Sequence, residues 1–355
     1  MSSIAFKSRL QVETSRRPPQ NQGMNPPNGV IVDYLLKDPK PDAKVKLAFL
    51  TADGTLIREY VGEVKTEQQK VAEKKAEEEK KAAAEKSKSA DKEKPTTETG
   101  VRSEGGEAEK LAGPEEKEKT PEEKKKEEEN KLPDSSRGLN RFAWNLRYPD
   151  AKKFEGLILW GGGTDGPRAT PGRYQARLTV GDQTVTAPFE ITADPRSKAS
   201  DADLKAQFDF LLGVRDKLSE IHQRIEDIRE VRKQITDLTK RIEGEARNTP
   251  IVDAGKALDK KMTAIEEALY QTKNKSSQDP LNYPIRLNDK LASLSDSVGT
   301  GDFGPTAQAI AVSQQLLAAI DGELTKLKQI WETELPAFNR LVREQAIDAV
   351  VLKKP

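Results

Sequence analysis

His222 is the first side chain to consider as an acid, a base or a metal ligand. It is the only histidine among the 355 residues, and the sequence contains no cysteine. Imidazole can serve as a general base or a ligand near neutral pH. However, Leu218 and Ile225, which lie about one helical turn away on either side, are apolar. This spacing places His222 on the core side of a helix, and we interpret it as a packing residue.

The scarcity of nitrogen and sulfur ligands limits the chemistry further. One histidine without cysteine cannot form a structural zinc site, an iron–sulfur site or a thiol nucleophile. No EF-hand spacing of carboxylates is present, although a hard-metal site made only of carboxylates stays open. No local spacing suggests a nucleophile beside a base. The sequence therefore predicts no catalytic residue, no cofactor and no enzymatic activity for this chain.

A glycine-rich loop from Gly161 to Gly166 superficially resembles a phosphate-binding loop. It lacks the Gly-Lys-Ser/Thr ending, and Pro167 and a predicted strand follow it instead of a helix. We interpret it as a connection between strands. Trp160, just before the glycines, is the candidate ligand contact, because an indole can stack on a sugar or a partner. Trp144 and Trp331 fall on apolar faces and are predicted to be core residues.

The overall charge offers no strong field. The 60 basic and 59 acidic side chains leave a net charge of +1, so nucleic acid is not an expected partner. No apolar run reaches membrane-spanning length, and residues 1–10 lack the apolar core of a secretion signal. If the protein is exported, its signal is expected upstream.

Short runs with period-two alternation predict an antiparallel β-sandwich over residues 25–63 and 133–195. Asp53-Gly54 and Gly181-Asp182 are typical hairpin turns between such runs. Phe142, Trp144, Leu146 and Tyr148 share one face of the predicted strand 140–148. Residues 1–24 are predicted to be a leader.

A Lys-, Glu- and Ala-rich insert occupies residues 64–132 and contains no aromatic residue. Such a composition cannot bury enough apolar surface to offset its ordering entropy. We interpret it as a low-complexity insertion within the sandwich, although solvated helix stays open because many Lys/Glu pairs are spaced four residues apart. The functional alternative is a polyelectrolyte binding arm.

Residues 200–350 show apolar residues every three or four positions, which predicts an antiparallel helical bundle. The stripe from Leu204 to Ile242 predicts a helix of roughly 60 Å. It is longer than the others, so part of its apolar face is expected to be available for self-association. Pro305 is expected at the first position of the last long helix, and Pro336 is expected to redirect the chain. Three further stripes begin at Leu258, Leu287 and Ile310.

Several segments resemble the region downstream of the propeller in bacterial sortilin-like proteins with neuraminidase-type repeats. The β part is also similar to the Ig-like domain of flagellar hook-capping proteins. The segments that carry the resemblance are Asn25-Pro26-Pro27, Val32-Asp33-Tyr34-Leu35-Leu36, Asp53-Gly54, Asn140 to Pro149, Pro171-Gly172-Arg173-Tyr174, Gln278 to Leu291, Gly301-Asp302 with Pro305-Thr306, and Leu335 to Asn339.

This resemblance implies a non-catalytic accessory region of a secreted propeller protein. It implies an α+β multidomain chain, a periplasmic or extracellular location in a bacterium, and a β-propeller of the same or a neighbouring polypeptide as partner. Family members are often labelled glycosyl hydrolases or exo-sialidase-like, yet no Ser-x-Asp-x-Gly-x-Thr-Trp box occurs here. Residues 1–24 could supply at most the last propeller strand, so no family site residue is assigned.

Two alternatives remain. The chain could be part of a glycosyl hydrolase whose propeller lies upstream, or its sandwich could bind carbohydrate through Trp160.

Overall fold

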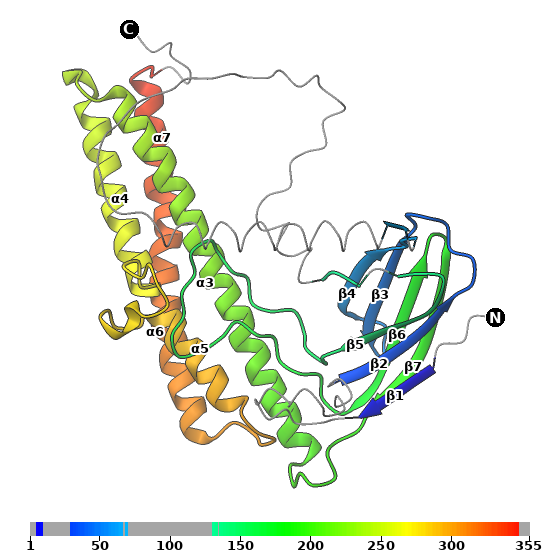
Figure 1. Ribbon diagram of the computed structural model, residues 1–355. Coiled ribbons are helices and arrows are strands. Elements are labelled where there is room, and N and C mark those ends of the chain that lie inside the picture. The colour runs from blue at the N-terminus through cyan, green and yellow to red at the C-terminus, as the bar shows by residue number, and fades with distance from the viewer. Residues whose placement is uncertain (1–4, 10–28, 67, 70–129, 134, 348–355) are drawn as a thin grey trace, which may run out of the picture. The chain divides into compact units, whose positions relative to one another are not determined.

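The computed structural model describes residues 5–9, 29–66, 68–69, 130–133 and 135–347. The chain divides into two units. The β unit comprises Met1–Trp144 and Arg173–Glu190, and the helical unit comprises Asn145–Gly172 and Ile191–Pro355. Two antiparallel sheets and a set of long helices confirm the expected mixture of α and β structure (Figure 1).

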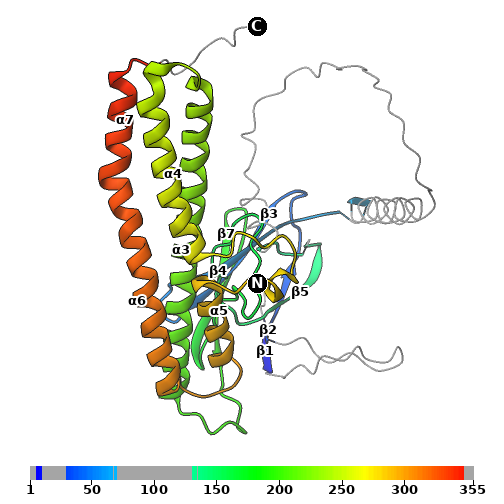
Figure 2. The ribbon, with the colours of Figure 1, turned by 90° about the vertical axis from the view of Figure 1, so that its left-hand side faces the viewer.

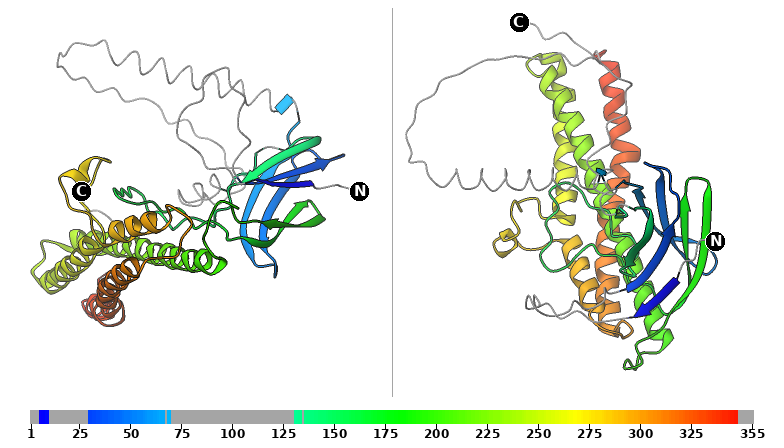
Figure 3. Two further views of the ribbon diagram at one scale, coloured as in Figure 1. Left: turned by 90° about the horizontal axis from the view of Figure 1, so that it is seen from below. Right: turned by 45° about the vertical axis from the view of Figure 1, so that its right-hand side comes forward.

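The β unit contains a three-stranded and a four-stranded sheet, visible from two further directions in Figure 3. The first has the order β1 (Ala5–Arg9), β2 (Gly29–Leu36), β5 (Gly138–Trp144). The second has the order β4 (Leu56–Glu63), β3 (Lys44–Thr51), β6 (Gly172–Val180), β7 (Gln183–Ile191). The predicted hairpin turn lies between β3 and β4, where Gly54 has φ +88°, a conformation that favours glycine.

Aromatic rings from both sheets share one core. Phe49 on β3 stacks on Trp144 on β5, with ring centroids 4.5 Å apart. Phe142 lies 4.6 Å from Tyr60 of β4. Trp144 is fully buried, which confirms its prediction as a core residue. These contacts follow from period-two alternation, since one face of each strand is apolar.

Both predicted boundaries of the low-complexity insert need correction. Val64 and Leu132 are buried. The Val61 amide donates to the Asn130 carbonyl, and the Leu132 amide donates to the Val61 carbonyl. The residues at each end therefore pair with β4 or lie beside it. Residues 70–129 lie outside the described residues.

The predicted leader is partly a strand. Residues 5–9 form β1, which pairs antiparallel with β2 from Ala5 opposite Asp33 to Arg9 opposite Gly29. This pairing differs from the propeller strand that the family resemblance suggested. Residues 1–4 and 10–24 lie outside the described residues.

The helical unit contains helices of different lengths. They are α3 (Asp201–Ile242), α4 (Thr249–Leu269), α5 (Leu287–Val298), α6 (Ala307–Gln329) and α7 (Leu335–Glu344), with short 3-10 turns at Ala246–Asn248 and Asp279–Leu281. Of these, α3, α4 and α6 with its continuation α7 run side by side (Figure 2). A capping box between Ser200 and Asp203 begins α3, because these two side chains satisfy amides that have no partner within the helix.

The apolar stripes of these helices meet in one core. Val214, Leu218, Ile221, Ile225 and Ile228 of α3 are buried there with residues of α4, α5 and α6. Helices α3 and α4 are antiparallel, since Gly255 near the start of α4 lies against Thr239 near the end of α3. A Cβ on Gly255 would lie 2.7 Å from the side chain of Thr239, so glycine permits this close approach.

The positions of Pro305 and Pro336 in the helices differ from those predicted. Thr306 caps α6 by accepting from the Ala309 amide, so Pro305 lies just before the cap and not at the first helical position. Pro336 does not redirect the chain. A π-helical turn at Ile330–Glu334 joins α6 to α7, and Pro336 lies in the first turn of α7, where the missing N–H costs little. Among the described helices, none is long and apolar enough to cross a bilayer.

Candidate functional site

The connection between β5 and β6, Asn145–Gly172, belongs to the helical unit, and we call it the strap. The predicted sandwich range 133–195 includes this segment, and for this segment the prediction is wrong. Leu146 has φ +66°, which ends the period-two pattern just after β5. Tyr148 then contacts Phe208 of α3, with centroids 4.9 Å apart, instead of continuing the strand face. Phe154 of the strap is buried in the helical core.

His222 of α3 contacts the main chain of the strap. It is fully buried, as its apolar neighbours predicted. Its Nδ1 contacts the Lys152 carbonyl, and its Nε2 lies 3.3 Å from the Asn288 side-chain nitrogen. A carbonyl can only accept and the Asn288 amide nitrogen can only donate. Both contacts therefore fit one neutral tautomer, with the proton on Nδ1.

Burial decides the charge state of this histidine. Removal from water lowers the pKa of His222 to about 4, and the bond to the Lys152 carbonyl opposes this shift only in part. The ring of Phe154 meets the imidazole edge to face at 5.2 Å. Near neutral pH His222 is thus an uncharged structural residue that is shielded from solvent.

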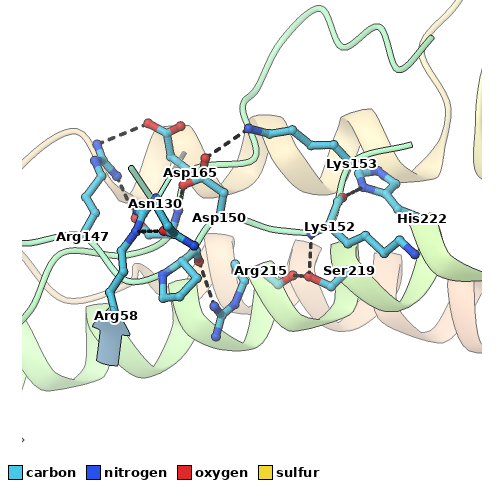
Figure 4. A network of polar contacts seen from close by, with 12 residues as sticks. Arg58, Asn130, Arg147, Asp150, Lys152, Lys153, Asp165, Arg215, Ser219 and His222 are labelled. Atoms are coloured by element: carbon cyan, nitrogen blue, oxygen red, sulfur yellow. Dashed lines mark hydrogen bonds and ion pairs between the residues drawn. The ribbon is translucent and has the colours of Figure 1, made fainter. Parts of the chain in front are cut away.

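Lys152 contacts α3 through its amide, its carbonyl and its ammonium group, and Figure 4 shows the first two of these contacts, to Ser219 and His222. Its amide donates to Ser219 Oγ at 3.1 Å, and its carbonyl faces His222. Its ammonium lies 2.5 Å from a Glu226 carboxylate oxygen and from Gln223 Oε1. His222 and Gln223 lie three and four residues after Ser219 and four and three residues before Glu226, so all four side chains lie along one side of α3.

Glu266 of α4 is a second buried polar centre, which the sequence did not indicate. It is 3% exposed and accepts from Arg229 Nε and Arg232 Nη1, both at 2.7 Å. Arg232 also donates to Asp259 at 2.7 Å. The Arg229 guanidinium lies over the ring of Phe154, 4.6 Å from its centroid. The same arginine therefore connects α4 to the strap.

Tyr270 extends this contact along the strap. Its hydroxyl donates to the Gly156 carbonyl at 3.0 Å and accepts from the Ile158 amide at 3.2 Å. Burial raises the pKa of this hydroxyl, so it stays protonated and able to donate.

The glycine-rich loop binds a carboxylate of its own chain. The amides of Trp160 and Gly161 donate to the two carboxylate oxygens of Asp289 at 2.8 and 3.1 Å. A Cβ on Gly162 would lie 2.1 Å from the Ala292 carbonyl carbon, so only glycine fits against α5. The likeness to an anion-binding loop therefore has a physical basis, but Asp289 occupies the position of the anion.

The indole of Trp160 faces outward. Trp160 is 47% exposed, whereas its backbone amide is hydrogen-bonded to Asp289. Trp331 is half-buried against the helical core, in agreement with its predicted packing role. Trp160 is therefore the one tryptophan of the three with a largely exposed surface.

Two shallow depressions occur elsewhere in the described residues, and neither holds a catalytic constellation. One, of about 330 Å³, lies in the β unit and is lined by Asp38, Lys40, Lys65 and Arg137 among others. The second, of about 320 Å³, is an apolar groove between α4 and α7. No group of three or more acidic or histidine side chains in the described ranges could hold a metal ion.

No protein-family model, curated protein or solved structure matches this sequence.

Proposed function

We propose that this chain is a non-catalytic structural and interaction module. The proposal rests on one observation: three buried polar side chains of the helical unit are bonded to other groups of the same chain. His222 is buried and bonded on both ring nitrogens, Asp289 accepts two strap amides, and Glu266 lies between two arginines. General acid–base catalysis requires a group within reach of a substrate. These three side chains instead form their hydrogen bonds and ion pairs with residues of their own chain.

The architecture we propose is an Ig-like sandwich followed by an antiparallel helical bundle. The common aromatic core of the two sheets supports the first, and the side-by-side helices around one apolar core support the second. Together with the family resemblance, this favours an accessory region of a periplasmic or extracellular bacterial protein. Its partner is then a β-propeller of the same or a neighbouring polypeptide.

Assays of the purified chain against sialosides and aryl glycosides test the absence of catalysis. We expect no turnover above buffer across the pH range in which the chain stays folded. Turnover that persists through repurification and co-elutes with the chain would contradict the proposal. The rival glycosidase hypothesis predicts repeat boxes in the coding sequence upstream, and hydrolysis by that upstream region alone.

Carbohydrate binding by Trp160 is a second candidate, supported by an exposed indole on a rigid main chain. A fixed aromatic plane suits the apolar face of a sugar ring, because little side-chain entropy is lost on stacking.

On a glycan array, the Trp160→Ala variant is expected to lose the binding that the native chain shows, since stacking on one indole supplies most of a weak contact. Tyr283→Ala is the matched control, because Tyr283 is an aromatic residue of the helical unit with 37% exposure. Equal binding by all three proteins, or no binding by the native chain, removes this candidate.

A further inference from the structure

The apolar depression of about 320 Å³ between α4 and α7, which we call the α4–α7 groove, has the shape of a site for a further chain segment. The buried side chains of Leu258 and Phe338 lie at its base. Alanines line its sides, Ala254 and Ala257 on α4 and Ala337 on α7. Because an alanine side chain is a single methyl group, the two helices leave room between these residues.

The groove carries little charge. Among its seven lining residues, Glu334 is the only charged one. Both carboxylate oxygens of Glu334 already accept from the Lys261 ammonium, at 2.9 and 2.7 Å. A segment that covers the groove therefore leaves no lining charge without a partner. Apolar side chains are the occupants that such a surface favours.

The C-terminal end of α7 turns the chain back over the helix. The amides of Ala346 and Ile347 donate to the carbonyls of Arg343 and Val342, at 3.0 and 3.4 Å. With Ala346 at φ +49°, these bonds form a Schellman motif, which ends the helix and reverses the chain. A Cβ disfavours this conformation, so an alanine stays in it where neighbouring contacts hold the turn. Ile347 supplies one such contact, since it packs against the helical core.

The sequence that follows has the right composition and length to reach the groove. Residues 348–355 lie outside the described residues, and four of them form the apolar run Ala349–Leu352. At about 3.3 Å per residue, an extended chain carries this run from about 7 to about 17 Å past Ile347. At 1.5 Å per residue, Leu341 and Ala337 lie about 9 and about 15 Å back along α7 from Ile347. The two intervals coincide.

We propose that Ala349–Leu352 lies in the α4–α7 groove and covers Leu258 and Phe338. Seven lining residues are too few for a stable interface with a separate protein, which uses about 20 to 30 residues on each side. A segment of the same chain needs fewer contacts, because its tether keeps it at a high effective concentration beside the groove. Removal of the apolar run and of the groove from water supplies the driving force.

Pairs of cysteines test this position directly, because the native chain has none. Ala337→Cys is combined with Val351→Cys or with Leu352→Cys, whose side chains point to opposite sides of an extended segment. At least one of the two pairs is expected to form a disulfide within one chain under mild oxidation. Asn339→Cys with the same partners is the matched control, because Asn339 is exposed at the same level but about 200° around α7. A tail that does not dock reaches both positions equally, whereas docking is expected to favour Ala337 by roughly tenfold in rate.

Urea denaturation provides a second, independent measurement. Leu352→Asp is expected to lower the urea midpoint of the native chain, because a carboxylate replaces an apolar side chain in the groove. In the Ala337→Arg chain the arginine occupies the groove, so the same substitution should leave the midpoint unchanged. Helical circular dichroism verifies that each variant folds.

Three results would overturn the inference. They are equal cross-linking at Ala337 and Asn339, an equal effect of Leu352→Asp in both chains, and disulfides that form only between two chains, which would assign the groove to a second copy. The glycoside assays are unaffected by any of these results, so a failure of this inference is distinguishable from a failure of the proposed function.

Discussion

Lowering the pH from about 7 to about 4 is expected to remove roughly 3 kcal/mol of the unfolding free energy through His222 alone. The unfolded chain binds a proton at this residue below its ordinary pKa of 6.5, but the folded chain binds one only below about 4. Between these values the unfolded state therefore holds more protons, and stability falls as the pH falls. At about 1.4 kcal/mol for each pH unit, the full interval corresponds to about 3.5 kcal/mol. Roughly 3 kcal/mol of this is lost by pH 4, because the folded chain is then already half protonated at His222.

The contacts of His222 explain why the fold resists its protonation. A proton on Nε2 would face the Asn288 amide nitrogen, which is also a donor. Asn288 cannot simply rotate to offer its oxygen, because that oxygen accepts from the Asp289 amide at 2.7 Å. The carbonyl of Lys152 contacts the ring, and the ammonium group of the same residue adds a positive charge that disfavours a second one on His222. Glu226 partly compensates this charge. Protonation therefore loosens the strap where it meets α3 and α5.

Chemical denaturation followed by helical circular dichroism, repeated at several pH values, measures this loss. His222→Asn is the control, since its amide can still donate towards the Lys152 carbonyl but cannot titrate in this range. Its stability should depend less on pH than that of the native chain. Because the sequence has one histidine, its imidazole NMR signal is unambiguous. A titration midpoint near 6.5 in the folded chain would show that the prediction is wrong.

Replacing Glu266 by alanine is expected to destabilise the helical unit by about 3 kcal/mol. The carboxylate is 3% exposed and satisfies two guanidinium groups of α3. Its removal leaves Arg229 and Arg232 partly desolvated without that partner. Arg232 keeps Asp259, and Arg229 keeps the ring of Phe154. These remaining contacts, and the partial exposure of both arginines, place the loss at the lower end of the range for a broken buried pair.

Glu267→Ala is the matched control, because it deletes the same side chain one position along α4 at an exposed site. We expect this control to change stability by less than about 0.5 kcal/mol. Equal effects of the two substitutions would mean that the Glu266 cluster contributes no more than an exposed carboxylate. Urea denaturation of both variants, compared at one pH, gives the answer.

Local patterns in the sequence are sufficient to predict the elements that depend on neighbouring residues. Period-two alternation located the strands, and Asp53-Gly54 located the hairpin between β3 and β4. Repeats of three or four residues located α3, and the apolar neighbours of His222 placed it in the core. Each of these features follows from residues a few positions apart, where backbone geometry alone decides which side chains share a face.

The role of the strap depends on contacts between residues that are far apart in the chain. Trp160 and Asp289 are 129 positions apart, and Lys152 and His222 are 70 apart. No periodicity links such pairs, so Gly161 to Gly163 could be interpreted only as a connection, and Phe154 gave no strand or helix pattern. In the sequence, Glu266 likewise looks like any other acidic residue on the solvated face of a helix. Burial, which depends on what packs against a residue from elsewhere in the chain, distinguishes these groups from their exposed neighbours.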